Sequence, residues 1–286
     1  MRELYENYRP LLFSIAYQMM GSVSDAEDAV QDVFVKLADR DLAQLKEPKS
    51  YLCKMVSNRC LDMLKSTQRQ REQYFGPWLP EPIETSAEDT AETVVRGELL
   101  SYAMLVLLER LSPLERAVFI LREALGFKYP DIAELVEKTE VYCRKLFSRA
   151  RAKMGFDPEM PLQPEAADEE WVHRFLSALE QGSMDSVLSL LSKDVVITSD
   201  GGGKASAAVH PIVSPIFVAR FALGVYRKFS AADGGIQIEH VSLNGQPGIV
   251  FRSQEGVEGA MLLHVEGDRI RDLFVVRNPD KLQRLF

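Results

Sequence analysis

The stretch from Pro130 to Ala150 decides the fold of the first half of the chain, and it reads PDIAELVEKTEVYCRKLFSRA. Its first seven residues predict a short helix, Glu137-Lys138 a tight turn, and Thr139 the N-cap of a second helix. One face of that second helix is apolar and consists of Cys143, Leu146, Phe147 and Ala150. The opposite face carries Tyr142, Arg144, Lys145, Ser148 and Arg149.

Two short helices of this kind, with polar and basic side chains facing outward on the second, are typical of a helix-turn-helix that reads DNA. A plain pair of antiparallel helices is the alternative, because short helices joined by a tight turn also occur without a DNA-binding role. Glu137 stands where such turns commonly have glycine.

Helical periodicity continues on both sides of this stretch, with apolar residues at spacings of three and four. We expect helices over Leu4–Met20, Ser24–Leu37, Ser50–Arg71, Glu98–Leu111, Pro113–Leu125, Glu169–Glu180, Met184–Leu191 and Pro215–Phe229. Alternating patterns predict antiparallel strands over Val195–Ser199, Ile236–Leu243, Gly248–Ser253, Ala260–Val265 and Ile270–Arg277. The chain therefore combines two all-α domains with a C-terminal α+β domain.

Two proline-rich, acidic stretches, which begin at Gly76 and Asp157, divide the chain. They predict a helical domain over 1–75, a linker over 76–97, the helix-turn-helix domain over 98–155, a second linker over 156–167 and the α+β domain over 168–286.

The net charge of -8 over 286 residues argues at first against a nucleic-acid-binding protein. The charge is unevenly distributed, because residues 1–154 carry -2 and the remainder -6. Two predicted helices are basic, over Lys54–Arg71 and Lys138–Lys153. The outer face of the first carries Lys54, Asn58, Asp62, Lys65 and Arg69. For either of these two helices, the alternative is that the basic face only contacts solvent.

Cys53, Cys60 and Cys143 are too few and too scattered for a disulfide framework, and none forms a C-x-x-C pair. We expect free thiols, a reducing interior and hence a cytoplasmic protein. No apolar run approaches the length of a membrane span, so we expect no membrane association. We also expect no metal site and no cofactor.

Three groups of residues resemble bacterial extracytoplasmic-function sigma factors of the sigma-70 family. Residues 25–34, DAEDAVQDVF, resemble the helix that binds core RNA polymerase. Residues 50–62 resemble the helix that melts the promoter and reads its downstream element, and residues 111–151 the domain that reads the upstream element. The match covers about residues 1–154.

Three further motifs resemble one subgroup of that family, whose members carry a SnoaL-like cone domain at the C-terminus. They are WLPEP at 78–82, DGGGK at 200–204 and NPDKL at 278–282. The resemblance implies that this domain regulates the sigma factor in cis. It also implies a base pocket near 39–49, beside Asn58.

The resemblance thus assigns roles to three sets of residues. The residues assigned to polymerase binding are Asp28, Gln31, Asp32 and Phe34. DNA binding falls to Lys54, Asn58, Asp62, Lys65, Arg69, Thr139, Tyr142, Arg144, Lys145, Ser148, Arg149 and Arg151. Interdomain regulation falls to Trp78, Leu79, Pro80, Glu81, Pro82, Asp200, Gly201, Gly202, Gly203, Lys204, Asn278, Pro279, Asp280 and Lys281.

The competing function is enzymatic, because SnoaL-like cones include isomerases and cyclases that transfer protons with an Asp/His pair. Asp200, His210, His240 and His264 are the available groups. Scattered histidines are more often structural, and fold alone is poor grounds for function. We therefore expect promoter DNA and core RNA polymerase as partners and no catalytic residue, while any small ligand of the cone domain is unknown. The alternative function is a SnoaL-like small-molecule isomerase, cyclase or ligand sensor fused to a DNA-binding module.

Overall fold

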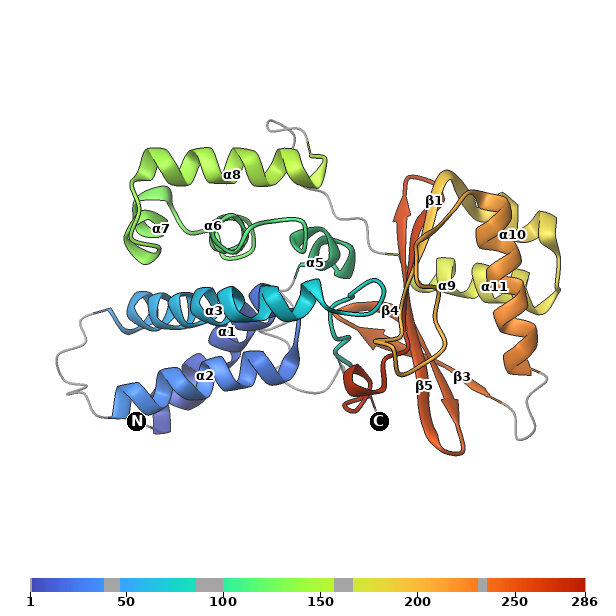
Figure 1. The fold of residues 1–286 in the computed structure, drawn as a ribbon, viewed down its shortest axis with the longest axis horizontal. Helices are drawn as coiled ribbons and strands as arrows, with labels where there is room; N and C mark the ends of the chain where they lie inside the picture. Colours follow the sequence, from blue (N-terminus) through green and yellow to red (C-terminus); the bar gives the residue numbers. More distant parts are fainter. Residues whose placement is uncertain (1, 39–46, 86–99, 157–166, 231–235, 286) are drawn as a thin grey trace. The chain divides into compact units, whose positions relative to one another are not determined.

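The computed structural model describes residues 2–38, 47–85, 100–156, 167–230 and 236–285, without the side chains of 67–72 and 229. The chain forms two compact units (Figure 1). Unit 1 comprises residues 1–72, 86–100 and 104–163, and unit 2 comprises 73–85, 101–103 and 164–286. The segment 73–85, expected mainly as linker, thus packs with the C-terminal unit.

The first half of unit 1 is a bundle of three helices. They are α1 (Arg2–Met20), α2 (Val23–Ala38) and α3 (Pro48–Glu72). Their apolar stripes meet in a core that includes Leu12, Ile15, Val30 and Leu52, each at most 3% exposed. Burying stripes of this kind supplies most of the stability of such helices, because isolated helices are marginal in water.

The second half of unit 1 is the expected helix-turn-helix with its supporting helices. It contains α5 (Tyr102–Leu108) from Met104 onward, α6 (Pro113–Glu123), α7 (Tyr129–Leu135) and α8 (Glu140–Met154). A capping box formed by Ser112 and Glu115 starts α6, with Pro113 in its first turn. Thr139 caps α8 through the Tyr142 amide, and Gly155 ends that helix with a φ of 84°.

A buried arginine joins the two halves of unit 1. Arg116, on α6, is only 3% exposed. Its Nη1 donates to the Met19 carbonyl oxygen at the end of α1 and to Glu109 Oε1, both at 2.7 Å. Lys54 of α3 also lies 3.3 Å from Glu137 of the helix-turn-helix turn. The two halves therefore share polar contacts between their helices.

Unit 2 is an α+β layer structure, with helices on one face of a sheet (Figure 1). The helices are α9 (Glu169–Glu180), α10 (Met184–Leu190) and α11 (Pro215–Ser230). The sheet has the order β2-β1-β6-β5-β4-β3. Its strands are β1 (Leu191–Asp200), β2 (Ile212–Val213), β3 (Gln237–Leu243), β4 (Gln246–Ser253), β5 (Gly256–Glu266) and β6 (Arg269–Val276). The helices and the sheet bury Phe175, Val218 and Leu273 between them.

The expected α+β cone is confirmed, with two differences in the sheet. The strands were expected to be antiparallel, but β1 pairs with β6 in parallel. Parallel neighbours need a long crossover, here α11 with the strands after it, and no local sequence pattern reports such a pairing. The short strand β2 was not expected, because two residues are too few for alternation to be recognised. A final 3₁₀ turn, η2 (Pro279–Lys281), follows β6.

Candidate functional site

The polymerase-binding residues expected on α2 share one side of that helix. Asp28 and Gln31 are exposed and Asp32 is half-buried. Arg59 Nε on α3 donates to Asp32 Oδ2 at 2.6 Å, which fixes the carboxylate. Val35, at the same side one turn later, is 60% exposed and was not expected from the sequence. The signal available in the sequence was a branched apolar residue that follows Asp32 by three positions and Asp28 by seven.

Phe34 lies apart from the other residues of α2 that were expected to bind polymerase. It was grouped with the polymerase-binding residues, but its side chain is only 8% exposed. Its ring packs edge-on against Tyr5 of α1, with centroids 4.8 Å apart. Position 34 lies toward the apolar stripe of α2, next to the buried Val33 and Leu37. Phe34 therefore holds α2 on α1 and leaves the outer face to its neighbours.

The outer face of α3 combines cations with an amide and an acid. Lys54 and Asn58 are half-buried, while Asp62 and Lys65 are exposed. Lys65 Nζ donates to Asp62 Oδ1 at 2.9 Å, and this hydrogen bond lowers the pKa of the Asp62 carboxyl. The side chain of Arg69 and most of the expected base pocket at 39–49 lie outside the described residues. The described part of α3 thus presents a mixed, mainly basic face.

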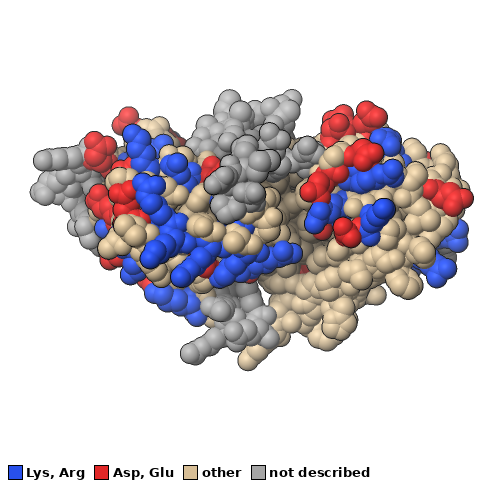
Figure 2. Space-filling model, turned by 90° about the horizontal axis from the view of Figure 1, so that it is seen from above, with Lys and Arg blue, Asp and Glu red and all other residues tan. Residues whose placement is uncertain are grey.

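The outer face of α8 is exposed along its length. Tyr142, Arg144, Lys145, Ser148 and Arg149 are all accessible, as is Val141, which was not expected. Thr139 Oγ1 accepts the Tyr142 amide at 3.3 Å, which caps the helix at its N-terminus. Figure 2 looks onto this side of unit 1 and shows Lys and Arg side chains gathered there.

Two details of the helix-turn-helix set the position of α8. Glu137 adopts a φ of 54°, the left-handed conformation that glycine takes in such turns, so the turn forms without glycine. The Arg144 guanidinium lies over the Tyr129 ring at 4.3 Å and also bonds Glu140. These contacts hold the first turn of α8 against α7.

Arg151 differs in burial from the other residues of α8 that were expected to bind DNA. It was grouped with the DNA-binding residues, but it is only 5% exposed. Its guanidinium lies 4.0 Å from Glu123 and 5.9 Å from the centre of the Phe147 ring. Because seven positions amount to nearly two turns, Arg151 lies on the same side of α8 as the exposed Arg144, but next to Glu123 of α6. Arg151 therefore joins α8 to α6.

The three motifs that resembled the regulatory subgroup converge within unit 2. Asp200, at the end of β1, is fully buried. Its Oδ1 accepts the Tyr74 hydroxyl at 2.6 Å, and its Oδ2 accepts the Leu79 amide at 2.9 Å. Lys281 Nζ donates to Asp200 Oδ2 at 2.7 Å and to the Leu79 carbonyl at 2.5 Å. One buried carboxylate and one ammonium thus hold the segment 73–85.

Aromatic rings and an amide complete this arrangement. The Lys281 ammonium lies 3.9 Å from the centre of the Trp78 ring. Asn278 Nδ2 donates to the Tyr74 hydroxyl oxygen at 2.8 Å. Burial, followed by the Asp200 carboxylate, raises the pKa of Tyr74 well above its usual value, so the hydroxyl stays a donor. We call the contact of Tyr74, Trp78 and Leu79 with Asp200, Asn278 and Lys281 the linker latch.

The other residues of the three motifs lie around the latch. Gly202 has a φ of 58°, and a Cβ there would lie 2.4 Å from Asn278 Nδ2, so glycine is required. Lys204 pairs with Asp280 at 2.5 Å on the surface. Pro80, Glu81 and Pro82 are buried, and Gly201 is buried while Gly203 is exposed. The Pro80 carbonyl accepts the Tyr102 hydroxyl at 2.6 Å. Asn278 caps the 3₁₀ turn that carries Pro279.

Beyond the latch, the segment 73–85 is paired to the β3–β4 hairpin. Thr85 N donates to the Ser242 carbonyl at 2.8 Å, and Asn244 N donates to the Ile83 carbonyl at 2.7 Å. Ile83 N donates in return to Asn244 Oδ1 at 3.1 Å. These contacts and Tyr74 were not expected, because pairing across 160 residues leaves no local pattern. Asp200 and Lys204, expected to reach another domain, contact the linker and η2 instead.

The side chains considered for proton transfer do not converge. His264 Nδ1 lies 2.7 Å from Asp272, whereas the His240 ring stacks on His173. His210 is exposed, and Asp200 lies in the latch. The three cysteines are buried, and burial raises the pKa of Cys60 to about 12. Within the described ranges no group of His, Cys, Asp or Glu is arranged for a metal ion.

Comparison with known proteins identifies the family. Residues 4–70 match sigma-70 region 2, and residues 101–154 match sigma-70 region 4. The chain is 35% identical over 287 aligned positions to the ECF RNA polymerase sigma factor SigJ of Mycobacterium tuberculosis, covering 97% of this chain and 91% of the relative. This chain belongs to the extracytoplasmic-function sigma factors.

As a sigma factor of this family, the protein directs promoter-specific transcription initiation. The crystal structure of M. tuberculosis SigJ matches it with a TM-score of 0.81 and 30% identity over 99% of both chains. The similarity therefore includes unit 2 as well as the two sigma regions. The resemblance stated from the sequence is confirmed. Among the described helices of this sigma factor, none combines the length and the apolar character of a membrane span.

Proposed function

We propose that this sigma factor binds core RNA polymerase through the outer face of α2. Asp28, Gln31 and Asp32 form an acidic and amide surface there, next to the exposed Val35. The Asp32–Arg59 ion pair supports the proposal, because it orders the carboxylate before the partner arrives. An apolar residue ringed by polar ones is a common centre for a protein interface.

The basic faces of α3 and α8 bind promoter DNA in this proposal. On α3, Lys54 and Lys65 contact phosphates, and Asn58 lies near the opened strand. On α8, Arg149 contacts a phosphate, whereas Tyr142, Arg144 and Lys145 reach base edges. The observation that carries the proposal is the outer face of α8, which is exposed from Val141 to Arg149 except at its inward positions.

Salt dependence of promoter binding by the holoenzyme tests this assignment. Replacing Arg149 with alanine removes one phosphate contact, so the slope of log affinity against log salt should flatten by about one unit. Arg220→Ala, an exposed change on α11, is the matched control and should leave the slope unchanged. An unchanged slope for Arg149→Ala would refute the phosphate contact.

We further propose that unit 2 regulates the sigma factor in cis through the linker latch. The segment 73–85 belongs to the connection between region 2 and region 4. The number of residues in that connection that are free to move therefore depends on whether the latch is closed or open. A closed latch withholds 13 residues from the connection between the two regions. The fully buried Asp200 carboxylate is the support, because this charge is stabilised by groups of the linker.

Limited proteolysis of the full chain tests the latch. With the latch closed, cleavage in 73–85 should be slow, since proteases need an exposed, extended chain. Asp200→Asn keeps the shape of the side chain but removes its charge, and it should speed cleavage at least tenfold. Asp272→Asn, at the His264 pair, is the control and should leave the cleavage rate in 73–85 unchanged. Equal rates for Asp200→Asn and the wild type would refute the latch.

The remaining assignments follow the same proposal. The protein acts in the cytoplasm with core RNA polymerase and promoter DNA, and without a catalytic residue of its own. In support, His264, His240 and Asp200 lie in three separate environments. A proton-transfer pair would need them within hydrogen-bond reach of one substrate.

A further inference from the structure

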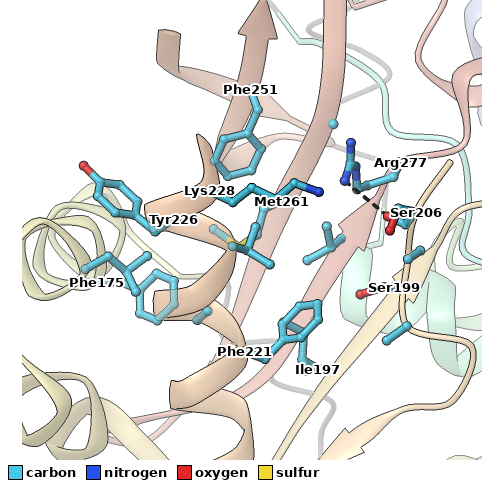
Figure 3. A pocket seen from close by; sticks show the side chains of 17 residues that line it. Phe175, Ile197, Ser199, Ser206, Phe221, Tyr226, Lys228, Phe251, Met261 and Arg277 are labelled. Atoms are coloured by element: carbon cyan, nitrogen blue, oxygen red, sulfur yellow. Dashed lines mark hydrogen bonds between the residues drawn. The ribbon is translucent and has the colours of Figure 1, made fainter. Parts of the chain in front are cut away.

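Unit 2 contains a pocket of about 240 Å³ between the sheet and the helices α9 and α11 (Figure 3). Its walls are mainly apolar and include the rings of Phe175, Phe221 and Phe251 with Met261. An engineered cavity of about 150 Å³ with a similar lining binds benzene. The pocket in unit 2 is therefore large enough for a molecule bigger than one aromatic ring.

In the wall of this pocket lies a buried hydroxyl that has no hydrogen-bond partner among the described residues. Ser199 is 2% exposed, and its Oγ has no hydrogen-bond partner among the described residues. Figure 3 shows this oxygen directed toward the interior of the pocket. Buried hydroxyls are nearly always paired, and leaving one unpaired costs free energy. An acceptor on a ligand would supply the missing partner.

Positive charge gathers on one side of the same pocket. Figure 3 shows the Lys228 side chain, from α11, extending toward Arg277 at the end of β6. Arg277 Nη2 lies 3.5 Å from Glu258, and its Nη1 donates to the Ser206 carbonyl. Lys228 has no carboxylate within 4 Å among the described residues, and none of the residues that line the pocket is acidic. Among the described residues, Lys228 therefore has no carboxylate that compensates its charge.

We propose that this pocket binds a small organic carboxylate whose body is an aromatic or aliphatic hydrocarbon. The phenyl rings and Met261 surround the hydrocarbon, and the carboxylate lies between Lys228 and Arg277. A carboxylate oxygen accepts the Ser199 hydroxyl. Such sites, apolar with a few placed polar groups, are the usual form of small-molecule pockets. Binding at this site does not depend on the proposed latch.

Two residues that line the pocket are direct sequence neighbours of residues in the linker latch. Ser199 directly precedes Asp200, and Arg277 directly precedes Asn278. The backbone amides of Arg277 and Asn278 both donate to the Asp200 carbonyl, at 2.7 and 2.9 Å. Alternate side chains of a strand point to opposite faces, so one face of β1 lines the pocket and the other holds the linker.

Calorimetric titration of the full chain with benzoate, 2-naphthoate and octanoate tests the proposal. The neutral amide of each acid has nearly the same shape and is the matched control. At least one carboxylate should bind with 1:1 stoichiometry and at least tenfold more tightly than its amide. Failure of all three carboxylates to bind, or equal binding of acid and amide, would overturn the proposal.

Variants of the full chain locate the site. Lys228→Gln changes an exposed side chain, and it should weaken the carboxylate at least threefold while leaving the amide unchanged. Lys193→Gln, exposed on β1 outside the pocket, should change neither. Ala222→Trp fills the pocket and should abolish binding of both. Carboxylate binding that is unchanged by Lys228→Gln would overturn the assignment of the charged end.

Discussion

Lys281 and Asp200, 81 residues apart, form a buried ion pair in which Nζ lies 2.7 Å from Oδ2. The same ammonium donates to the Leu79 carbonyl and lies over the Trp78 ring. A buried pair is costly to break from one side, because the remaining charge stays desolvated. The pair therefore couples the end of the chain to the segment that connects the two sigma regions.

Replacing Lys281 with methionine should destabilise unit 2 by about 3–5 kcal/mol, because it strands the Asp200 carboxylate without its cation. Urea unfolding of the full chain, followed by tryptophan fluorescence, measures the change. Lys204→Met removes the exposed pair with Asp280 and should cost only about 0–1 kcal/mol. Equal decreases in the free energy of unfolding for the two variants would contradict the claim that Lys281 forms a buried, stabilising ion pair.

Glu137→Gly should be more stable than Glu137→Ala by about 1 kcal/mol. Both variants remove the Lys54–Glu137 ion pair, so their difference isolates the backbone. With a φ of 54°, position 137 is strained for any residue that carries a Cβ. Thermal unfolding of the two variants measures the difference, and an alanine variant at least as stable as the glycine one would contradict the turn geometry.

Glu115→Gln should destabilise unit 1 by about 1–2 kcal/mol at pH 7, with a difference that shrinks in acid. Burial acts to raise the pKa of Glu115, but hydrogen bonds from Lys153 and Ser112 outweigh it and lower the pKa below 4.5. The carboxylate therefore stabilises the fold fully above its unfolded pKa, and this contribution is lost as the pH falls through the folded pKa.

Denaturant unfolding of wild type and Glu115→Gln from pH 7 to pH 3 follows this loss. Glu140→Gln is the control, since its pair with Arg144 is exposed and should contribute about 0.5 kcal/mol or less. A Glu115→Gln difference that grows as the pH falls would have the wrong sign for a lowered pKa.

Two buried serines should respond oppositely to alanine. Ser199→Ala removes an unpaired hydroxyl and should stabilise the ligand-free protein by about 1 kcal/mol. Ser14→Ala removes a hydroxyl that accepts from Gln18 Nε2 at 3.0 Å, leaves the Ser14 carbonyl as an acceptor at 3.2 Å, and should destabilise the protein by about 0.5–1 kcal/mol. Melting temperatures of the two variants decide this, and a destabilised Ser199→Ala would show that its hydroxyl has a partner.

The helices were predictable from the sequence because their cores are periodic. The bounds expected for α9 are those of the structure, and Thr139 caps α8 as expected. Periodicity is less informative at the edges of an apolar stripe. Phe34 and Arg151 received their binding roles from the family resemblance, which does not report burial, and both are buried.

Pairing between distant segments was not predictable in the same way. The parallel β1–β6 pair and the binding of Tyr74 to Asp200 join residues that are 70 or more positions apart. The three motifs pointed to a regulatory contact, but only the structure identified the linker as what Asp200 holds. The pocket beside it leaves no motif, since its lining comes from seven separate segments of α9, α11, four strands and a loop.

Run-off transcription with purified core RNA polymerase tests the central claim most directly. Lys281→Met opens the latch, whereas Lys204→Met leaves it closed. The full chain should yield promoter-dependent transcripts, Lys281→Met should change their amount at least threefold, and Lys204→Met should match the wild type. Transcript from Lys281→Met equal to wild type would contradict regulation by the latch, and no promoter-dependent transcript from any of the three proteins would contradict the sigma-factor assignment itself.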